Sequence, residues 1–184
     1  MEMKIPPSLK HEHGELRASL DIAAKAVGKS GEAAREVARL MGPHFTREED
    51  FALPPLDALA GLAGGRLPED PTAIIAKAER LNRELADMLK EHTAIARSLE
   101  ALYDAATADE RPELARFARK LLLHAQMEEQ IYYPCSDELF AAITELVRRH
   151  DRHYARGQAL PADIGERERE FTRQSLRGML GHLL

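Results

Sequence analysis

One short pattern occurs twice in this chain and limits what the chain can fold into. His44 is followed four residues later by Glu48, then by Glu49 and, at the next break, by Pro54. The string from 124 to 134 repeats this order without a gap, displaced by 80 positions, with His124 and Glu128 in the places of His44 and Glu48. Residues four apart lie on one face of a helix, about 5–6 Å from each other, so the His and Glu of each pair can coordinate a metal together.

A second pattern repeats alongside the first. Glu12-His13, followed by Leu16 and Leu20, corresponds to Glu91-His92, followed by Ile95 and Leu99, at a displacement of 79. The repeat of both patterns in the same order predicts two copies of one helical hairpin.

Apolar residues at spacings of three and four surround both copies, which is typical of amphipathic helices. Ala, Leu, Glu and Arg dominate, Trp is absent and only 5% of residues are aromatic, so the composition also favours helix. The predicted fold is all-α: an antiparallel up-down-up-down four-helix bundle with an extra C-terminal helical extension. We divide the chain at 134, into a bundle over 1–134 and an extension over 135–184.

Helix boundaries follow from caps and prolines. We expect a first helix capped by Ser8 and reaching Val27, and a third that opens at Asp70-Pro71. The other expected helices run from about 31 to 53, with a kink at Pro43, and from about 112 to 133, followed by amphipathic stretches at about 137–156 and 166–183.

The histidines of both repeated patterns, and the glutamates four residues after His44 and His124, lie on the apolar stripes of their helices. They therefore point into the core. Without a metal, this set would bury carboxylates and imidazoles at a cost of several kcal/mol each. Imidazole suits iron, zinc, copper or nickel, and two carboxylates can bridge a pair of divalent ions. The predicted metal ligands are His13, His44, Glu48, His92, His124 and Glu128.

These residues resemble the hemerythrin-like, histidine–histidine–glutamate cation-binding domains over about 5–134. The resemblance implies two iron ions bridged by the two glutamates, with zinc or nickel as possible substitutes, and a role in binding oxygen or responding to oxygen, nitric oxide, redox state or iron supply. The chain differs from the oxygen-carrying hemerythrins, which have a further histidine one turn from His92, where this chain has Met88 and Ala96, and an aspartate in place of Glu128.

Three functions compete. The leading interpretation is a non-haem di-iron binding protein that senses or binds oxygen, nitric oxide, peroxide or iron without turnover, because no substrate-binding motif is found. The first alternative is a di-iron enzyme acting on peroxide, oxygen or nitric oxide, with Tyr132 or a flanking glutamate (Glu49, Glu129) moving protons. The second is a structural, metal-stabilised interaction bundle.

The charge and cysteine content limit the kinds of binding partner and the cellular location that we expect. The formal charge of −5 is spread along the chain, and no segment approaches the roughly 20 apolar residues that span a bilayer, so neither nucleic acid nor membrane is expected. Cys135 is the only cysteine, which favours the cytoplasm and makes a cysteine-based metal cluster a poor candidate. A protein partner or a homodimer is possible through the C-terminal extension.

Overall fold

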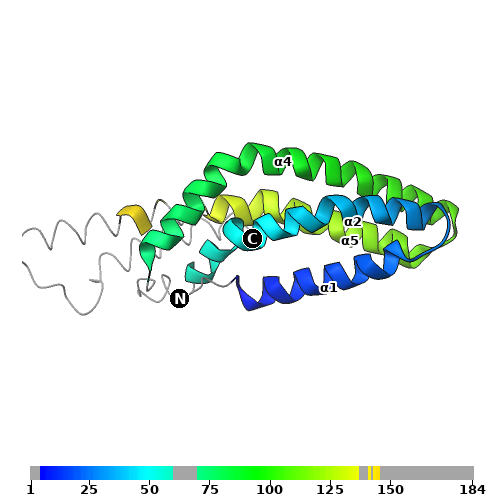
Figure 1. Cartoon of the computed structure of the whole chain (residues 1–184), viewed down its shortest axis with the longest axis horizontal. Helices are drawn as coiled ribbons and strands as arrows, with labels where there is room; N and C mark the ends of the chain where they lie inside the picture. Colours follow the sequence, from blue (N-terminus) through cyan, green and yellow to red (C-terminus); the bar gives the residue numbers. More distant parts are fainter. Residues whose placement is uncertain (1–4, 60–69, 137–140, 142, 146–184) are drawn as a thin grey trace, which may run out of the picture.

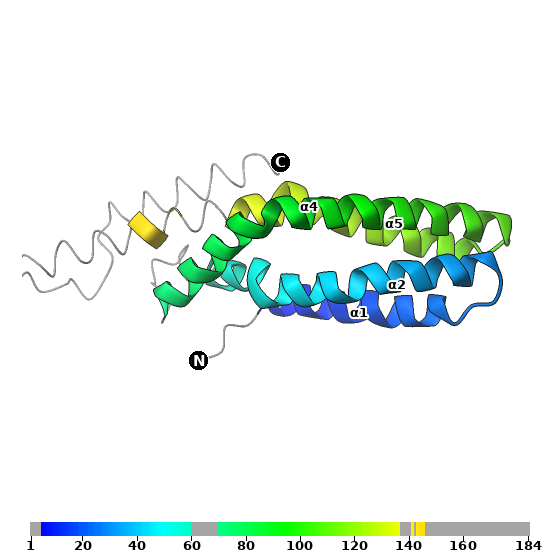
Figure 2. The same cartoon turned by 45° about the horizontal axis from the view of Figure 1, so that its top comes forward.

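The computed structural model of the chain describes residues 5–59, 70–136, 141 and 143–145. Four long helices form an antiparallel bundle, as Figures 1 and 2 show: α1 (Pro7–Ala24), α2 (Lys29–Arg47), α4 (Pro71–Ala108) and α5 (Pro112–Met127). Helix α2 packs against α1 and α4, α5 packs against α4, and α5 and α1 close the ring. These described residues contain no strand, so the prediction of an all-α bundle is confirmed.

The first hairpin differs in detail from the sequence prediction. Helix α1 begins at Pro7 with Pro6 as its N-cap, because proline fits the first helical position, and the predicted cap Ser8 lies inside the first turn. The helix ends at Ala24, and Val27 is 77% exposed rather than part of the buried stripe. Gly28, which precedes α2, has a φ of 90°, a conformation that favours glycine.

The two helices that carry the repeated His and Glu motif both change geometry at their glutamate. Helix α2, which contains Pro43, passes directly into a π-helical turn, η1 (Glu48–Ala52), and then into the 3₁₀ turn η2 (Pro54–Ala58). Helix α5 passes in the same way into the π-helical turn η3 (Glu128–Tyr132). In the first copy the N–H of Leu53 donates to the C=O of Glu48, five residues back, at 2.9 Å. The sequence prediction did not include either π turn.

The longest helix, α4, starts as predicted. The side chain of Asp70 accepts a hydrogen bond from the N–H of Ala73 at 2.9 Å, and Pro71 occupies the first helical position. Helix α4 then continues without a break for 38 residues, so it reaches both ends of the bundle and supplies residues to the core along its length.

Apolar clusters fill the bundle on both sides of a polar centre. The larger cluster, which includes Leu16, Val37 and Leu102, fills the half that holds the α1–α2 and α4–α5 connections. Smaller clusters on the other side include Phe51, Leu81, Met88 and Tyr133 in one, and Ile5, Leu9, Leu53 and Leu56 in the other. The core therefore encloses the polar centre from both directions along the bundle axis.

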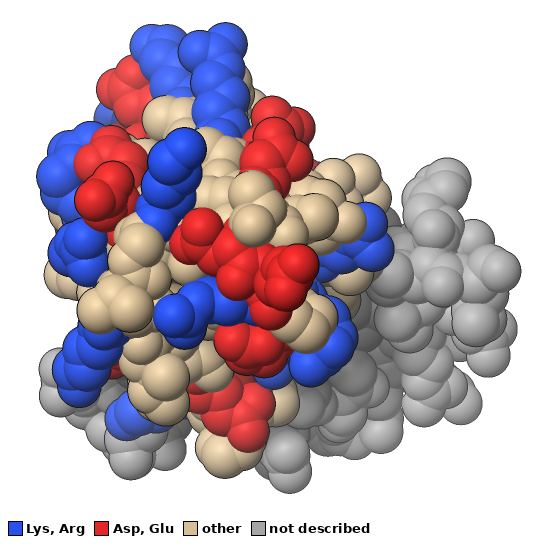
Figure 3. Space-filling view, turned by 90° about the vertical axis from the view of Figure 1, so that its right-hand side faces the viewer, with Lys and Arg blue, Asp and Glu red and all other residues tan. Residues whose placement is uncertain are grey.

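The surface carries charges of both signs. At the end of the bundle that holds the two hairpin connections, Lys and Arg side chains alternate with Asp and Glu, as Figure 3 shows. Within the described part of the chain, no helix combines the length and the apolar character needed to cross a bilayer.

The expected C-terminal stretches cannot be compared with this fold. The stretch at 137–156 lies mostly outside the described residues, and the stretch at 166–183 lies wholly outside them. The division of the chain at 134 therefore stays a prediction.

Candidate metal centre

The structure brings all the predicted ligands together in the middle of the bundle, one histidine from each long helix and one glutamate from each π turn. Each of these side chains is at most 3% exposed. Their helical spacing places them on the same stripes as the apolar core, so packing of the core aims them at one another. The residues are His13, His44, Glu48, His92, His124 and Glu128.

These side chains form two groups that share one carboxylate. The first group contains His44, Glu48, His92 and Glu128, and the second contains His13, His124 and Glu128; within each group the candidate ligand atoms lie within 4.8 Å of one another. Nε2 of His124 lies 2.9 Å, and Nε2 of His13 lies 3.4 Å, from Oε1 of Glu128.

Glu48 lies between the groups in a similar way. Its Oε1 is 3.2 Å from Nε2 of His44, and its Oε2 is 3.9 Å from Nε2 of His13. Each of the two glutamates therefore lies within reach of both groups.

Several buried polar atoms of this cluster have no hydrogen-bond partner: Oε2 of Glu48, Oε2 of Glu128 and Nε2 of His124. The last atom is close to Glu128 but is not aligned with it as a hydrogen bond. Buried polar atoms are nearly always satisfied, so unpartnered atoms from three residues at one point indicate a missing ligand. Imidazole nitrogen and carboxylate oxygen are suitable donors for a first-row divalent metal, so the residues fit such an ion.

A second set of glutamates faces the outer nitrogen of each histidine ring. Nδ1 of His13 donates to Glu49 at 3.0 Å and Nδ1 of His92 donates to Glu129 at 2.9 Å. These two glutamates are the flanking residues of the repeated motif, whose role the sequence left open, and they contact the rings of the neighbouring helices.

The other two rings are contacted by glutamates that the sequence analysis had noted only as parts of the repeat. Nδ1 of His44 donates to Glu91 at 2.9 Å, and Nδ1 of His124 lies 3.2 Å from Oε1 of Glu12. All four rings thus turn Nε2 towards the centre and Nδ1 towards a carboxylate, an arrangement that orients metal-binding histidines. Glu12 and Glu91 occupy matching positions in the repeat, directly before His13 and His92. This match was the sequence signal that could have identified the two glutamates as partners of the rings.

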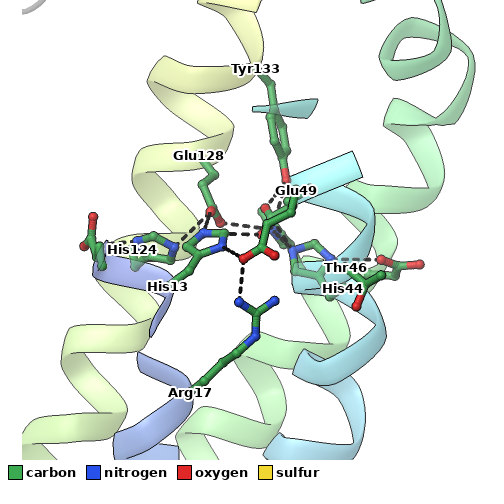
Figure 4. Close-up of polar contacts among 12 residues, drawn as sticks. His13, Arg17, His44, Thr46, Glu49, His124, Glu128 and Tyr133 are labelled. Atoms are coloured by element: carbon green, nitrogen blue, oxygen red, sulfur yellow. Dashed lines mark hydrogen bonds and ion pairs between the residues drawn. The ribbon is translucent and has the colours of Figure 1, made fainter. Parts of the chain in front are cut away.

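Two arginines of the first hairpin support outer glutamates. Arg17 donates to Glu49 at 2.5 Å, as Figure 4 shows. Arg47 donates both to Glu91 and, at 2.7 Å, to Glu84. The corresponding positions of the second hairpin hold Ala96 and Met127, so these two arginines have no counterpart in the second copy of the repeat.

A tyrosine that the sequence analysis missed also enters the centre. Tyr133 is 2% exposed, and its hydroxyl donates to Oε1 of Glu48 at 2.7 Å. From the sequence, Tyr132 was the tyrosine considered for moving protons, but the structure brings the neighbouring Tyr133 into the centre instead. Because the turn is π-helical, the residue five positions on, rather than four, comes into line, and Tyr132 instead packs against the cluster of Ile5 and Leu9.

The buried charges perturb one another strongly. Burial and the nearby charge of Glu48 raise the pKa of Glu128 to about 8. Burial also opposes ionisation of Glu48, but contacts with His44, His92 and Tyr133 outweigh it and hold the pKa of Glu48 well below its usual range. Burial disfavours the charged form of His44, yet the carboxylates of Glu48 and Glu91 prevail and raise its pKa to about 9. Two carboxylates this close cannot both be ionised without added positive charge.

A helical bundle with a buried cluster of histidines and glutamates at its core is typical of helix-bundle metal-binding proteins. The hemerythrin HHE cation binding domain matches residues 5–135, and the chain belongs to this family. No significant match was found among curated proteins or among solved structures. Membership of the family implies cation binding, and the cluster of histidines and glutamates is the place in the described bundle that suits it.

Proposed function

We propose that His13, His44, Glu48, His92, His124 and Glu128 hold two metal ions, iron in the native protein, and that the centre binds or senses a small molecule such as oxygen, nitric oxide or peroxide, or iron itself. The observation that carries the proposal is the convergence of unpartnered buried atoms from Glu48, Glu128 and His124. The two groups, one around His44 and His92 and one around His13 and His124, supply a place for each ion. Zinc or nickel can occupy the same donors.

The small size of the ligand follows from burial and from coordination. Six protein side chains shared by two ions leave coordination positions open. The side chains around those positions are at most 3% exposed, and apolar clusters lie on both sides. A diatomic molecule or peroxide reaches such a centre far more readily than an organic substrate does.

One observation favours an enzyme as the second candidate. The hydroxyl of Tyr133 is a proton-bearing group 2.7 Å from Glu48 and 3.4 Å from Nε2 of His92. A positioned donor at this distance is what proton transfer to a reacting molecule requires. Turnover of hydrogen peroxide, oxygen or nitric oxide by metal-loaded protein separates this candidate from binding alone.

The remaining parts of the proposal concern the whole chain. The match to the family ends at residue 135, which supports a metal-binding bundle over 1–134 and a separate extension over 135–184. The single cysteine supports a cytoplasmic location. The extension is the proposed surface for a protein partner or a second copy of the chain.

The first experiment is metal analysis of protein purified without oxygen from iron-replete cells, followed by its visible spectrum before and after air is admitted. We expect two iron ions per chain and new visible absorption after exposure to air. Well-folded protein that takes up no iron under these conditions contradicts the proposed iron centre. A stable load of two zinc or nickel ions, with no uptake of ferrous iron, contradicts the choice of iron but keeps the six ligands.

A further inference from the structure

The two halves of the metal centre are related by the repeat, but one position breaks the symmetry. Tyr133 and Leu53 both follow their π turn directly, five residues after Glu128 and Glu48. Tyr133 reaches into the polar centre, whereas Leu53 is fully buried in an apolar cluster with Ile5 and Leu9. The centre therefore has a hydroxyl group from one copy of the repeat and an aliphatic side chain in its place in the other.

The hydroxyl of Tyr133 is held in a fixed position. Its ring stacks on that of His92, with centroids 5.7 Å apart and planes at 20°, and packs in the cluster of Phe51, Leu81 and Met88. Figure 4 shows the ring descending from its helix with the hydroxyl aimed at the cluster of carboxylates. A side chain packed on all sides in this way cannot swing to another partner without moving its neighbours.

Among the described residues of the centre, Glu48 is the partner left to accept the hydrogen bond of the Tyr133 hydroxyl when a metal is bound. The hydroxyl lies 2.7 Å from Oε1 of Glu48 and 3.4 Å from Nε2 of His92. Nε2 of His92 is the ring nitrogen that faces the centre, since Nδ1 already donates to Glu129. A metal bound at Nε2 would occupy the lone pair of that nitrogen. The hydroxyl of Tyr133 would then donate its hydrogen bond to Glu48.

This donation acts on one metal position and not on the other. Oε1 of Glu48 is the oxygen that faces His44 and His92, at 3.2 and 3.8 Å, whereas Oε2 is the oxygen nearer to His13. Among the described residues around Glu128, no hydrogen bond from a tyrosine is present. A carboxylate oxygen that accepts a hydrogen bond gives less electron density to a cation, and such partners tune metal sites.

On the basis of the proposed two-metal centre, we propose that Tyr133 is a positioning residue that makes the two metal positions inequivalent. Through Oε1 of Glu48 it weakens and orients the carboxylate donor at the position of His44 and His92. The position of His13 and His124 lacks this influence. The two ions then bind in distinguishable steps and have different coordination environments.

The test compares wild-type protein with Tyr133→Phe, which removes only the hydroxyl. Both proteins are loaded anaerobically with two equivalents of ⁵⁷Fe²⁺ and examined by Mössbauer spectroscopy, and stepwise affinities are measured by titration with Fe²⁺. The wild type is expected to show two quadrupole doublets of equal area. In Tyr133→Phe the doublets should converge, and the ratio of the two dissociation constants should fall by about tenfold or more, the scale of such partners.

The matched control is Tyr132→Phe. Tyr132 is the neighbouring residue of the same chain segment, and it packs against the apolar cluster of Ile5 and Leu9 instead of entering the centre. Loss of its hydroxyl should leave both the doublets and the affinities at their wild-type values.

The outcomes separate the role of Tyr133 from the existence of the centre. Two bound irons with identical spectra and affinities in wild type and Tyr133→Phe overturn the inference and leave the metal centre in place. A single doublet in wild-type protein that holds two irons overturns it without any variant, so the test does not depend on the variant folding. Wild-type protein that binds no iron refutes the proposed function itself.

Discussion

Nε2 of His44 and Nε2 of His92 lie 2.7 Å apart in the core of the bundle. Nδ1 of each ring already donates to a glutamate, Glu91 for the first ring and Glu129 for the second. When both imidazoles are neutral, each has one N–H, and the two inner nitrogens then present lone pairs to each other. A proton or a metal ion at this point turns a repulsive contact into a favourable one.

Metal binding should therefore stabilise the fold. An ion present at a hundred times its dissociation constant adds about 2.7 kcal/mol to the free energy of unfolding, and in a protein of this size that raises the melting midpoint by about 5–10 °C. Thermal unfolding of chelator-treated protein, with and without added Zn²⁺, measures the difference. Zinc is suitable because it has no redox chemistry. Equal midpoints, with zinc shown to be absent from the protein, would contradict a cation site in the core.

Removing one histidine from each group should abolish loading of both metals. In the double variant His44→Ala with His124→Ala, each group loses a ligand and keeps too few donors for tight binding. We expect loading to fall from two ions per chain to none while the far-ultraviolet circular dichroism remains helical. The control is His11→Ala, because the His11 side chain is 80% exposed and, within the described part of the chain, pairs with Glu15 at the surface. Full loading of the double variant would refute the assignment of the ligands.

The outer glutamates should affect metal affinity without being ligands. Glu129→Ala removes the acceptor of Nδ1 of His92, so the ring loses its fixed orientation and its preferred tautomer. Loss of such a partner costs about 10- to 100-fold in metal affinity. Competition with a coloured chelator measures the change. Glu36→Ala is the control, since the partner of Glu36 among the described residues is Arg39, on the exposed face of α2. An equal loss in both variants would count against an orienting role.

Arg47 should matter less than the glutamate it supports. Arg47→Met places the side chain of the corresponding position, Met127, in the first hairpin and leaves Glu91 bonded to His44. Because partly exposed ion pairs contribute about 0–1 kcal/mol, the free energy of unfolding should fall by no more than about 1 kcal/mol. Chemical denaturation and chelator competition should both show a smaller effect than Glu91→Ala, and a larger one would make Arg47 itself part of the metal site.

Much of the centre could be predicted because helical periodicity and the repeat act together. His44 and Glu48 recur as His124 and Glu128, and side chains four apart on an apolar stripe must face one core. The start of α4 was also predictable, since Asp70 and Pro71 carry their signal locally. Features whose signal lies within one short segment of sequence could therefore be predicted.

Tyr133 could not be placed because the π turn before it depends on packing around the whole bundle. Prolines follow both turns, at Pro54 and Pro134, and indicate that the regular hydrogen-bond ladder is interrupted. They do not say whether the preceding turn contains four or five residues. One added residue moves the next side chain by about 100° around the helix, which decides between Tyr132 and Tyr133.

Asp109 links the two hairpins at the end of the bundle and makes stability depend on pH. Helix α2 has Gly28 as its N-cap, which offers no side chain, and Oδ2 of Asp109 instead accepts the N–H of Ser30 at 2.9 Å. This backbone hydrogen bond lowers the pKa of Asp109 below its usual value of 3.8. A carboxyl whose pKa falls on folding stabilises the protein above the unfolded pKa, and the contribution disappears as the pH falls through the folded pKa.

Asp109→Ala should therefore lower the melting midpoint by a few degrees at pH 7, and the deficit should shrink below about pH 4. Thermal unfolding of both proteins between pH 7 and pH 3 checks this, with Asp104→Ala, an exposed acid on α4, as the control. A deficit that stays the same at pH 3 would show that the charge of Asp109 is not what supports the start of α2.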